Sequence, residues 1–262
     1  PGAMAPMLGG GYKLQPNTVW FDTDPIVSDF EDAPELKLNR DHIFYTAIKE
    51  QIQAGNLSGT VVFYGCPGEE GCAGKAFMAR DGIFRDLDAA LSWHPSDVNG
   101  VTTGSNMACL QMEYTFHGIA AHAAGNPDKG RSALDAVSLM NIGVQFLREH
   151  IPHTDCLHYS ILDAGGISPN VVQPTAKVLY MLRSDTVRHA RKLLERVRKI
   201  ANGAAMMTET EVTIRQVAAY ANTIANDVIN ERYETYLEHF LPLDYTEEEM
   251  EYLRKFQAVI PE

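Results

Sequence analysis

Two adjacent acidic residues, Glu69 and Glu70, lie in a glycine-rich turn directly after a strand-like run of residues. Neighbouring side chains in such a turn point in different directions, so one carboxylate can bind a metal ion while the other takes a proton from water. A hydrolase that uses a metal-bound water needs this division between ligand and general base. His94 follows a second strand-like run and is a candidate second ligand, because the carboxyl ends of parallel strands meet at one edge of a sheet. Solvated turn carboxylates and an ordinary loop histidine are the alternative interpretation.

Three further residues have side chains suited to contact a substrate. His122 is flanked by small residues that would let a ligand approach closely, and Asn170 lies in a bend rich in glycine and proline. Arg183 falls on the outward phase of an expected strand, where its guanidinium can bind a carboxylate through two parallel hydrogen bonds. A loop histidine and a solvated edge arginine are the structural alternatives for these positions.

A β-α-β unit is expected to position the two glutamates and His94. Residues 60–64 are β-branched and aromatic and lie between two glycines, which indicates a buried strand. A helix is expected over about 73–80 and a second strand over 89–93. This partial β-α-β catalytic layer places the fold in the α/β class.

A second unit follows, in which strands and helices come in the order β-α-β-β-α-β. This order is typical of a ferredoxin-like α+β satellite domain, a sheet with two helices on one face. In its first strand, Met112, Tyr114 and Phe116 alternate with polar residues, which predicts a half-exposed strand. The expected strands are 110–117, 157–162, 176–183 and 209–215, and the expected helices run from the cap Ser132 to about His150 and from the cap Asp185 or Thr186 to about Met206.

The chain divides into four expected parts. These are an irregular arm (1–40), a partial catalytic domain (41–105), the ferredoxin-like satellite domain (106–218) and a return segment of two acidic helices toward the catalytic domain (219–262). The 22 Lys and Arg residues against 34 Asp and Glu residues give a net charge of −12, which argues against a nucleic-acid surface. We find no membrane-spanning apolar run and no secretory signal, and we expect a cytoplasmic protein with reduced cysteines.

Several ordered motifs resemble the metal-dependent aminoacylase/carboxypeptidase superfamily of amidohydrolases. Within that superfamily the chain is most similar to the aminobenzoyl-glutamate utilisation protein B branch. The resemblance covers about residues 57–218. The motifs are GTVVFYGCPGEEG (59–71), DAALSWHP (88–95), GIAAHAA (118–124), GRSALDAV (130–137), GGISPNVVQ (165–173) and MTET (207–210).

The resemblance implies a metal-dependent hydrolase that cleaves the amide bond of N-acyl amino acids or small peptides such as aminobenzoyl-glutamate. In such enzymes two divalent ions, zinc or manganese, hold a bridging water. Glu69 would be the general base that deprotonates this water, and Glu70 and His94 would be metal ligands.

The resemblance also assigns the residues of the satellite domain, which serves as a dimerisation and lid domain in the family. His122 would polarise the scissile carbonyl or stabilise its oxyanion, in the family commonly across a dimer. Asn170 and Arg183 would help to hold the carboxylate end of the substrate. The implied partners are therefore a small-molecule substrate and a second copy of the chain in a homodimer.

The chain departs from the family pattern in its metal ligands. Residues 1–40 contain no histidine or cysteine, no histidine follows residue 240, and His42 lacks the neighbours of the family's early metal-binding run. The motifs therefore favour a hydrolase, while the missing ligands favour a truncated or degenerate relative that acts through dimerisation or ligand binding without turnover.

Overall fold

The structure is a computed structural model. The expected arm and the residues Glu69 and Glu70 lie outside the residues that it describes. It describes residues 51–56, 58, 60, 62, 64, 66, 68, 73–92, 94 and 98–259.

In the expected β-α-β unit the helix is present and the second strand is not, while the first strand, expected over 60–64, lies partly outside the described residues. Helix α4 (Gly74–Arg80) confirms the helix expected over about 73–80. The strand expected over 89–93 is wrong for the residues described there, since the first three lie in no strand and Ser92 makes only an isolated bridge. These residues are exposed, with Leu91 at 52%, so they bury too little apolar surface to be held in a sheet.

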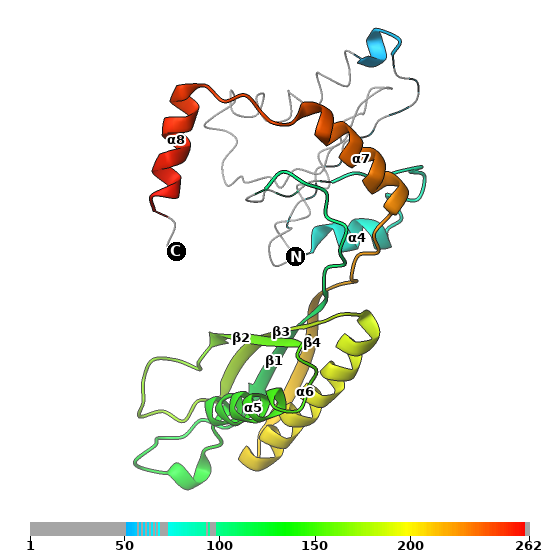
Figure 1. Ribbon diagram of the computed structural model, residues 1–262. Helices are drawn as coiled ribbons and strands as arrows, with labels where there is room; N and C mark the ends of the chain where they lie inside the picture. Colours follow the sequence, from blue (N-terminus) through cyan, green and yellow to red (C-terminus); the bar gives the residue numbers. More distant parts are fainter. Residues whose placement is uncertain are drawn as a thin grey trace.

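The ferredoxin-like satellite domain is confirmed. Its four strands form one antiparallel sheet in the order β2-β3-β1-β4, and Figure 1 shows both of its helices on one face of that sheet. Strands β2 and β4 are therefore the two edges. The elements are β1 (Ala108–His117), α5 (Ala133–Arg148), β2 (Cys156–Asp163), β3 (Thr175–Ser184), α6 (Val187–Thr208) and β4 (Glu211–Tyr220), with a short 3-10 turn at Pro127–Lys129 before α5.

Side-chain caps fix where the helices of this domain begin. The Ser132 hydroxyl accepts the Asp135 N–H at 3.1 Å, as the sequence predicts for the start of α5. The Thr186 hydroxyl accepts the His189 N–H at 3.3 Å, so Thr186 rather than Asp185 caps α6.

The core lies between the sheet and the two helices, and its largest fully buried side chains include Tyr114, Tyr180 and Phe116. The expectation that the first strand is half-exposed is wrong, because its outward residues Gln111 and Glu113 are only 8% and 9% exposed. Strand β1 is central, so long side chains from both neighbouring strands cover its outer face. The Glu113 carboxylate thus accepts hydrogen bonds from the Arg215 guanidinium at 3.1 and 3.3 Å.

Two acidic helices follow β4, as the sequence predicts. They are α7 (Asp227–Phe240), capped by the Asn226 side chain, and α8 (Glu247–Gln257), which begins with a capping box between Thr246 and Glu249. Across the described ranges, none of the helices combines the length and the apolar character needed to cross a membrane.

Candidate functional site

The structure brings His122 and Asn170 together on two paired loops. The first loop joins β1 to α5, and the second joins β2 to β3. The Ala123 N–H donates to the Asn170 carbonyl at 2.9 Å, and the Val172 N–H donates to the Ala121 carbonyl at 2.9 Å. His122 itself forms an isolated antiparallel bridge with Val171. These backbone hydrogen bonds place the predicted catalytic residue His122 beside the predicted substrate-binding residue Asn170 at one end of the sheet.

Glycine makes the close approach of these segments possible. The Ile119 and Arg131 backbones exchange two hydrogen bonds of 2.9 Å, and the Gly118 N–H donates to the Pro174 carbonyl at 2.7 Å. A Cβ atom at Gly118 would lie 2.0 Å from the Arg131 carbonyl oxygen, and one at Gly130 would lie 2.8 Å from the Val172 side chain. Glycine at position 118 is therefore a condition for the loop geometry.

The ring of His122 is held in one tautomer. Its Nδ1 atom accepts the N–H groups of Ala124 at 3.2 Å and of Gly125 at 3.0 Å. In a neutral imidazole one nitrogen accepts while the other carries the proton, so the Nε2–H group is the donor of this ring. The side chain is exposed, and such an N–H donor can polarise a carbonyl group or stabilise an oxyanion.

Arg183 lies at the opposite end of the same sheet. The loop that carries Asn170 leads into Thr175, the first residue of the ten-residue strand β3, whereas Arg183 is the ninth. At a rise of about 3.3 Å per residue, Thr175 and Arg183 are about 26 Å apart. The structure therefore joins His122 to Asn170 but does not bring Arg183 to them within one copy of the chain.

The surroundings of Arg183 form a row across the sheet. Cys109 pairs with both Arg183 and Tyr220, and Cys156 pairs with Arg183, so the four side chains lie on one face. Burial and a hydrogen bond with Cys109 raise the pKa of Tyr220, while the neighbouring Arg183 guanidinium lowers it. Cys109 and Cys156 are free thiols. The exposed Arg183 guanidinium thus lies beside the Tyr220 phenol, where solvent and a carboxylate can reach it.

The structure describes only part of the metal site that the sequence predicts. Glu69 and Glu70 lie outside the described residues, and His94 is described with an exposed side chain. Among the residues that are described, no three His, Cys, Asp or Glu side chains are grouped to hold a metal ion. The described residues alone therefore do not form the expected metal centre.

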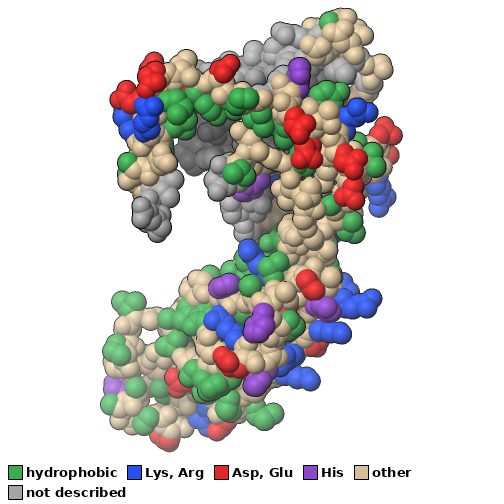
Figure 2. All heavy atoms as spheres, viewed as in Figure 1, with side chains coloured by type: hydrophobic (Ala, Val, Ile, Leu, Met, Phe, Trp, Pro, Cys, Tyr) green, Lys and Arg blue, Asp and Glu red, His purple; other side chains and the backbone are tan. Residues whose placement is uncertain are grey.

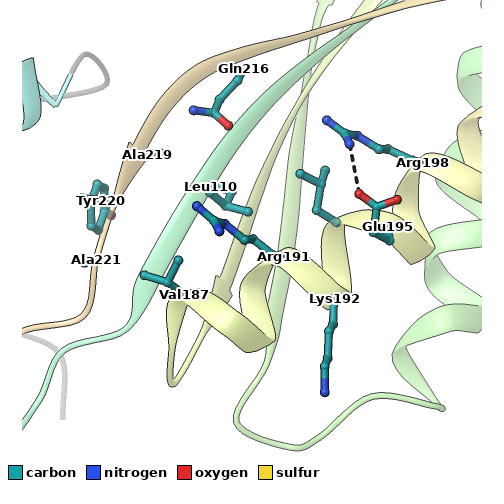
Figure 3. Close-up of a pocket in the computed structure, with 11 residues that line it drawn as sticks. Leu110, Val187, Arg191, Lys192, Glu195, Arg198, Gln216, Ala219, Tyr220 and Ala221 are labelled. Atoms are coloured by element: carbon teal, nitrogen blue, oxygen red, sulfur yellow. Dashed lines mark hydrogen bonds and ion pairs between the residues drawn. The ribbon is translucent and has the colours of Figure 1, made fainter.

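A groove of about 540 Å³ lies between α6 and β4 (Figure 3) and holds none of the predicted site residues. The Arg198 guanidinium pairs with Glu195 at 3.0 Å, and Figure 3 shows Lys192 extending away from the groove. Figure 2 shows the basic side chains of α6 spread along the surface of the domain. We interpret this groove as the border of the solvent-exposed basic face of α6.

Sequence reasoning missed one link that supports the loop pair. The Arg131 Nε atom lies 2.8 Å from Glu209 Oε2, and these residues belong to two separate motifs that the sequence analysis identified without giving either residue a role. They are 78 positions apart, so no local spacing predicts their contact.

Comparisons with known proteins agree with this fold. Residues 106–208 match the family model described as a peptidase dimerisation domain. The chain is 45% identical over 214 residues to a subunit of the p-aminobenzoyl-glutamate hydrolase of Escherichia coli K12, an alignment that covers 82% of this chain and 44% of that protein. It is 29% identical over 174 residues to the Xaa-Arg dipeptidase of Mus musculus, covering 66% of this chain and 40% of that enzyme.

One solved structure shares the fold over most of the chain. The aminobenzoyl-glutamate utilization protein from Klebsiella pneumoniae superposes with a TM-score of 0.61 at 23% identity, covering 88% of this chain and 61% of that one. The chain thus spans less than half the length of the curated relatives that it matches. These findings confirm the resemblance drawn from the motifs: the chain carries a peptidase dimerisation domain and is a relative of the p-aminobenzoyl-glutamate hydrolase.

Proposed function

We propose that the chain belongs to a metal-dependent amidohydrolase that cleaves the amide bond of N-acyl amino acids or small peptides, with p-aminobenzoyl-glutamate as the first candidate substrate. The observation that carries this proposal is the pairing of His122 and Asn170 on adjoining loops. It occurs in a chain 45% identical to a hydrolase subunit named for that substrate.

Each predicted residue has one task in this reaction. Glu69 would take a proton from the attacking water, and Glu70 and His94 would help to hold a divalent ion, zinc or manganese, whose chemistry when bound is to activate water and offset negative charge. The Nε2–H group of His122 donates to the oxygen of the scissile carbonyl. Asn170 and Arg183 hold the carboxylate end of the substrate, with Arg183 providing the charge.

A single copy of the chain cannot complete this arrangement. His122 and Asn170 lie on loops at one end of the sheet, and Arg183 lies about 26 Å along β3 from Thr175, where the Asn170 loop enters that strand. A dipeptide-sized substrate spans only about 7 Å. The two ends must therefore meet through a second copy, and we propose a homodimer in which each site combines residues of both chains.

The edge strand β2 is a suitable surface for that homodimer. Among the strands that the structure describes it pairs with β3 alone, so one row of its backbone groups is available for another strand. Tyr159 and Ile161 are 41% and 47% exposed on this strand although they point to the helix-covered side of the sheet. On the same side of the other edge strand, β4, Val212 and Ile214 are instead partly buried against the core.

Antiparallel pairing of two β2 strands about a twofold axis would bring opposite ends of the two sheets to the same side. The His122–Asn170 loops of one copy would then lie at the same end as Arg183 of the other copy. In this arrangement residues 41–105 and 219–262 would supply the catalytic layer beside the satellite domain.

The experiment uses the complete protein, equilibrated with zinc or manganese, against a panel of N-acyl amino acids that includes p-aminobenzoyl-glutamate. We expect release of the free amino acid that depends on added metal and falls at least about a hundredfold in Glu69→Ala. Glu149→Ala, which removes an exposed carboxylate at the end of α5, is the control.

A different experimental result would contradict each part of the proposal. Hydrolysis that survives Glu69→Ala would remove the general-base assignment. A panel in which p-aminobenzoyl-glutamate alone stays intact would remove that substrate. No turnover of any substrate by the metal-loaded protein would instead indicate a relative that acts through dimerisation or ligand binding.

A further inference from the structure

The loop that carries His122 is tied to the end of helix α6 by one side chain. Arg131 lies on the return leg of this loop, where its backbone pairs with Ile119. Its Nη1 atom donates to the carbonyls of Asp128 at 3.0 Å and Gly130 at 2.7 Å. Its Nε atom donates to the Glu209 carboxylate at 2.8 Å. One guanidinium thus closes the loop on itself and fastens it to the C-terminal cap of α6.

Glu209 holds a backbone conformation that a side chain disfavours. Its φ of 52° is left-handed, and helices commonly place glycine at such an end because glycine has no Cβ to clash. Glu209 is also exposed at 71% of its side chain, and exposed ion pairs add little to stability. Neither the backbone nor the stability of the fold therefore accounts for a glutamate at this position.

We infer that the Arg131–Glu209 ion pair is a positioning device that holds the His122–Asn170 loops in the geometry of the proposed reaction. This inference rests on the proposed function and adds two positioning residues to it. Both act through His122, since the bridge between Ile119 and Arg131 lies three residues before His122, on the same leg of the loop. Small displacements of a substrate-contacting group reduce turnover strongly.

The first test separates positioning from stability with Glu209→Gly in the complete, metal-loaded protein. Glycine relieves the backbone at this position while it removes the carboxylate. We expect the melting temperature to stay level or rise and kcat to fall about tenfold. A fall in melting temperature with unchanged kcat would overturn the inference, because the glutamate would then serve the fold alone.

The second test measures the loop directly by amide hydrogen exchange in Glu209→Gln. The N–H groups of Ala124 and Gly125, which His122 accepts, should exchange about tenfold faster when the ion pair is lost. Glu195→Gln is the matched control, since it breaks the Arg198–Glu195 pair of 3.0 Å on the same helix, away from the loop. Equal exchange in both variants would overturn the inference.

The two tests also separate this inference from the proposed function. If the unmodified protein turned over no substrate, the proposed function would fail, while the exchange rates would still show whether Glu209 orders the loop. If the unmodified protein were active and both Glu209 variants matched the control in kcat and in exchange, only the positioning role would fail.

Discussion

The two ends of the four-stranded sheet hold their functional side chains in different ways. At one end, His122 and Asn170 lie on loops that are fixed by backbone hydrogen bonds and by a glycine where no Cβ fits. At the other end, Arg183 lies within a strand, in a row with Cys109 and Tyr220. The loop end offers neutral hydrogen-bonding groups and the strand end offers a positive charge. In the proposed reaction each end would hold half of what an N-acyl amino acid requires, with the sheet as a spacer between the halves.

The largest expected effect comes from removing one half at a time. His122→Ala and Arg183→Ala should each lower kcat/KM at least about a hundredfold, since each removes a group that contacts the reacting carbonyl or the carboxylate in the proposed site. Mixing the two inactive variants and letting the subunits exchange should restore about a quarter of the unmodified activity, because half of the dimers are mixed and each mixed dimer has one intact site.

This complementation decides whether the halves come from different copies. A mixture that stays inactive although mixed dimers are present would overturn the shared site, because a site built from two copies must be restored in a mixed dimer. Mixed dimers can be isolated with two affinity tags, and a variant mixed with itself serves as the control.

The next effect concerns the surface that brings the ends together. Ile161→Lys places a charge on the free edge of β2 and should weaken dimerisation at least about tenfold, because a lysine on an edge strand opposes pairing with a second strand. Met206→Lys, at an exposed apolar residue near the end of α6, is the control. Sedimentation at several concentrations measures the dissociation constant. A dimer unaffected by Ile161→Lys would show that β2 is not the interface.

A smaller effect concerns the stability of the sheet that separates the two ends, and it is tested at two buried tyrosines. The Tyr180 hydroxyl donates to Asn141 Oδ1 at 2.6 Å, so Tyr180→Phe should lower the free energy of unfolding by about 1–3 kcal/mol by leaving a buried acceptor unpaired. The Tyr114 hydroxyl has no partner within the described part of the chain, so Tyr114→Phe should change that energy by less than about 1 kcal/mol or increase it. Denaturant unfolding measures both, and equal losses would contradict this account.

The smallest effect is a pH dependence of the stability of the fold, which arises from Glu113 on the outer face of the sheet. The hydrogen bond from Arg215 lowers the pKa of Glu113, and Lys177 acts in the same direction. The folded pKa is therefore below the unfolded value of about 4.3, so the carboxylate stabilises the fold above that pH. This stabilisation is lost as the pH falls through the folded pKa.

Glu113→Gln should therefore lower stability by about 1 kcal/mol at neutral pH, a modest value because Arg215 is largely exposed. The difference between the two proteins should vanish in acid. Thermal unfolding from pH 7 to pH 3 measures it, and a difference that persists at pH 3 would contradict the assignment to Glu113.

The parts of the domain that depend on short segments could be predicted from the sequence. The capping of α5 by Ser132 and the order of strands and helices follow from local patterns, and the structure confirms both. The burial of Glu113 could not be predicted, because it depends on side chains from two strands that neighbour β1 only in the folded sheet.

The candidate site divides in the same way. Motif residues such as His122 and Asn170 could be named from the sequence, and their pairing was not visible until the loops were placed. The tie between Arg131 and Glu209 joins segments 78 residues apart, and it is mediated by side chains that any surface position could carry. The strand expected over 89–93 failed because its described residues are exposed, so they bury too little apolar surface to be held in a sheet.

If β2 is the dimer interface, its edge links catalysis to the amount of protein. If each site needs residues from two chains, diluting the protein below its dimer dissociation constant removes both sites of a dimer in one step. Activity per milligram would then fall with dilution and recover on concentration. The concentration of the chain in its cell would then determine the activity of each molecule as well as the number of molecules.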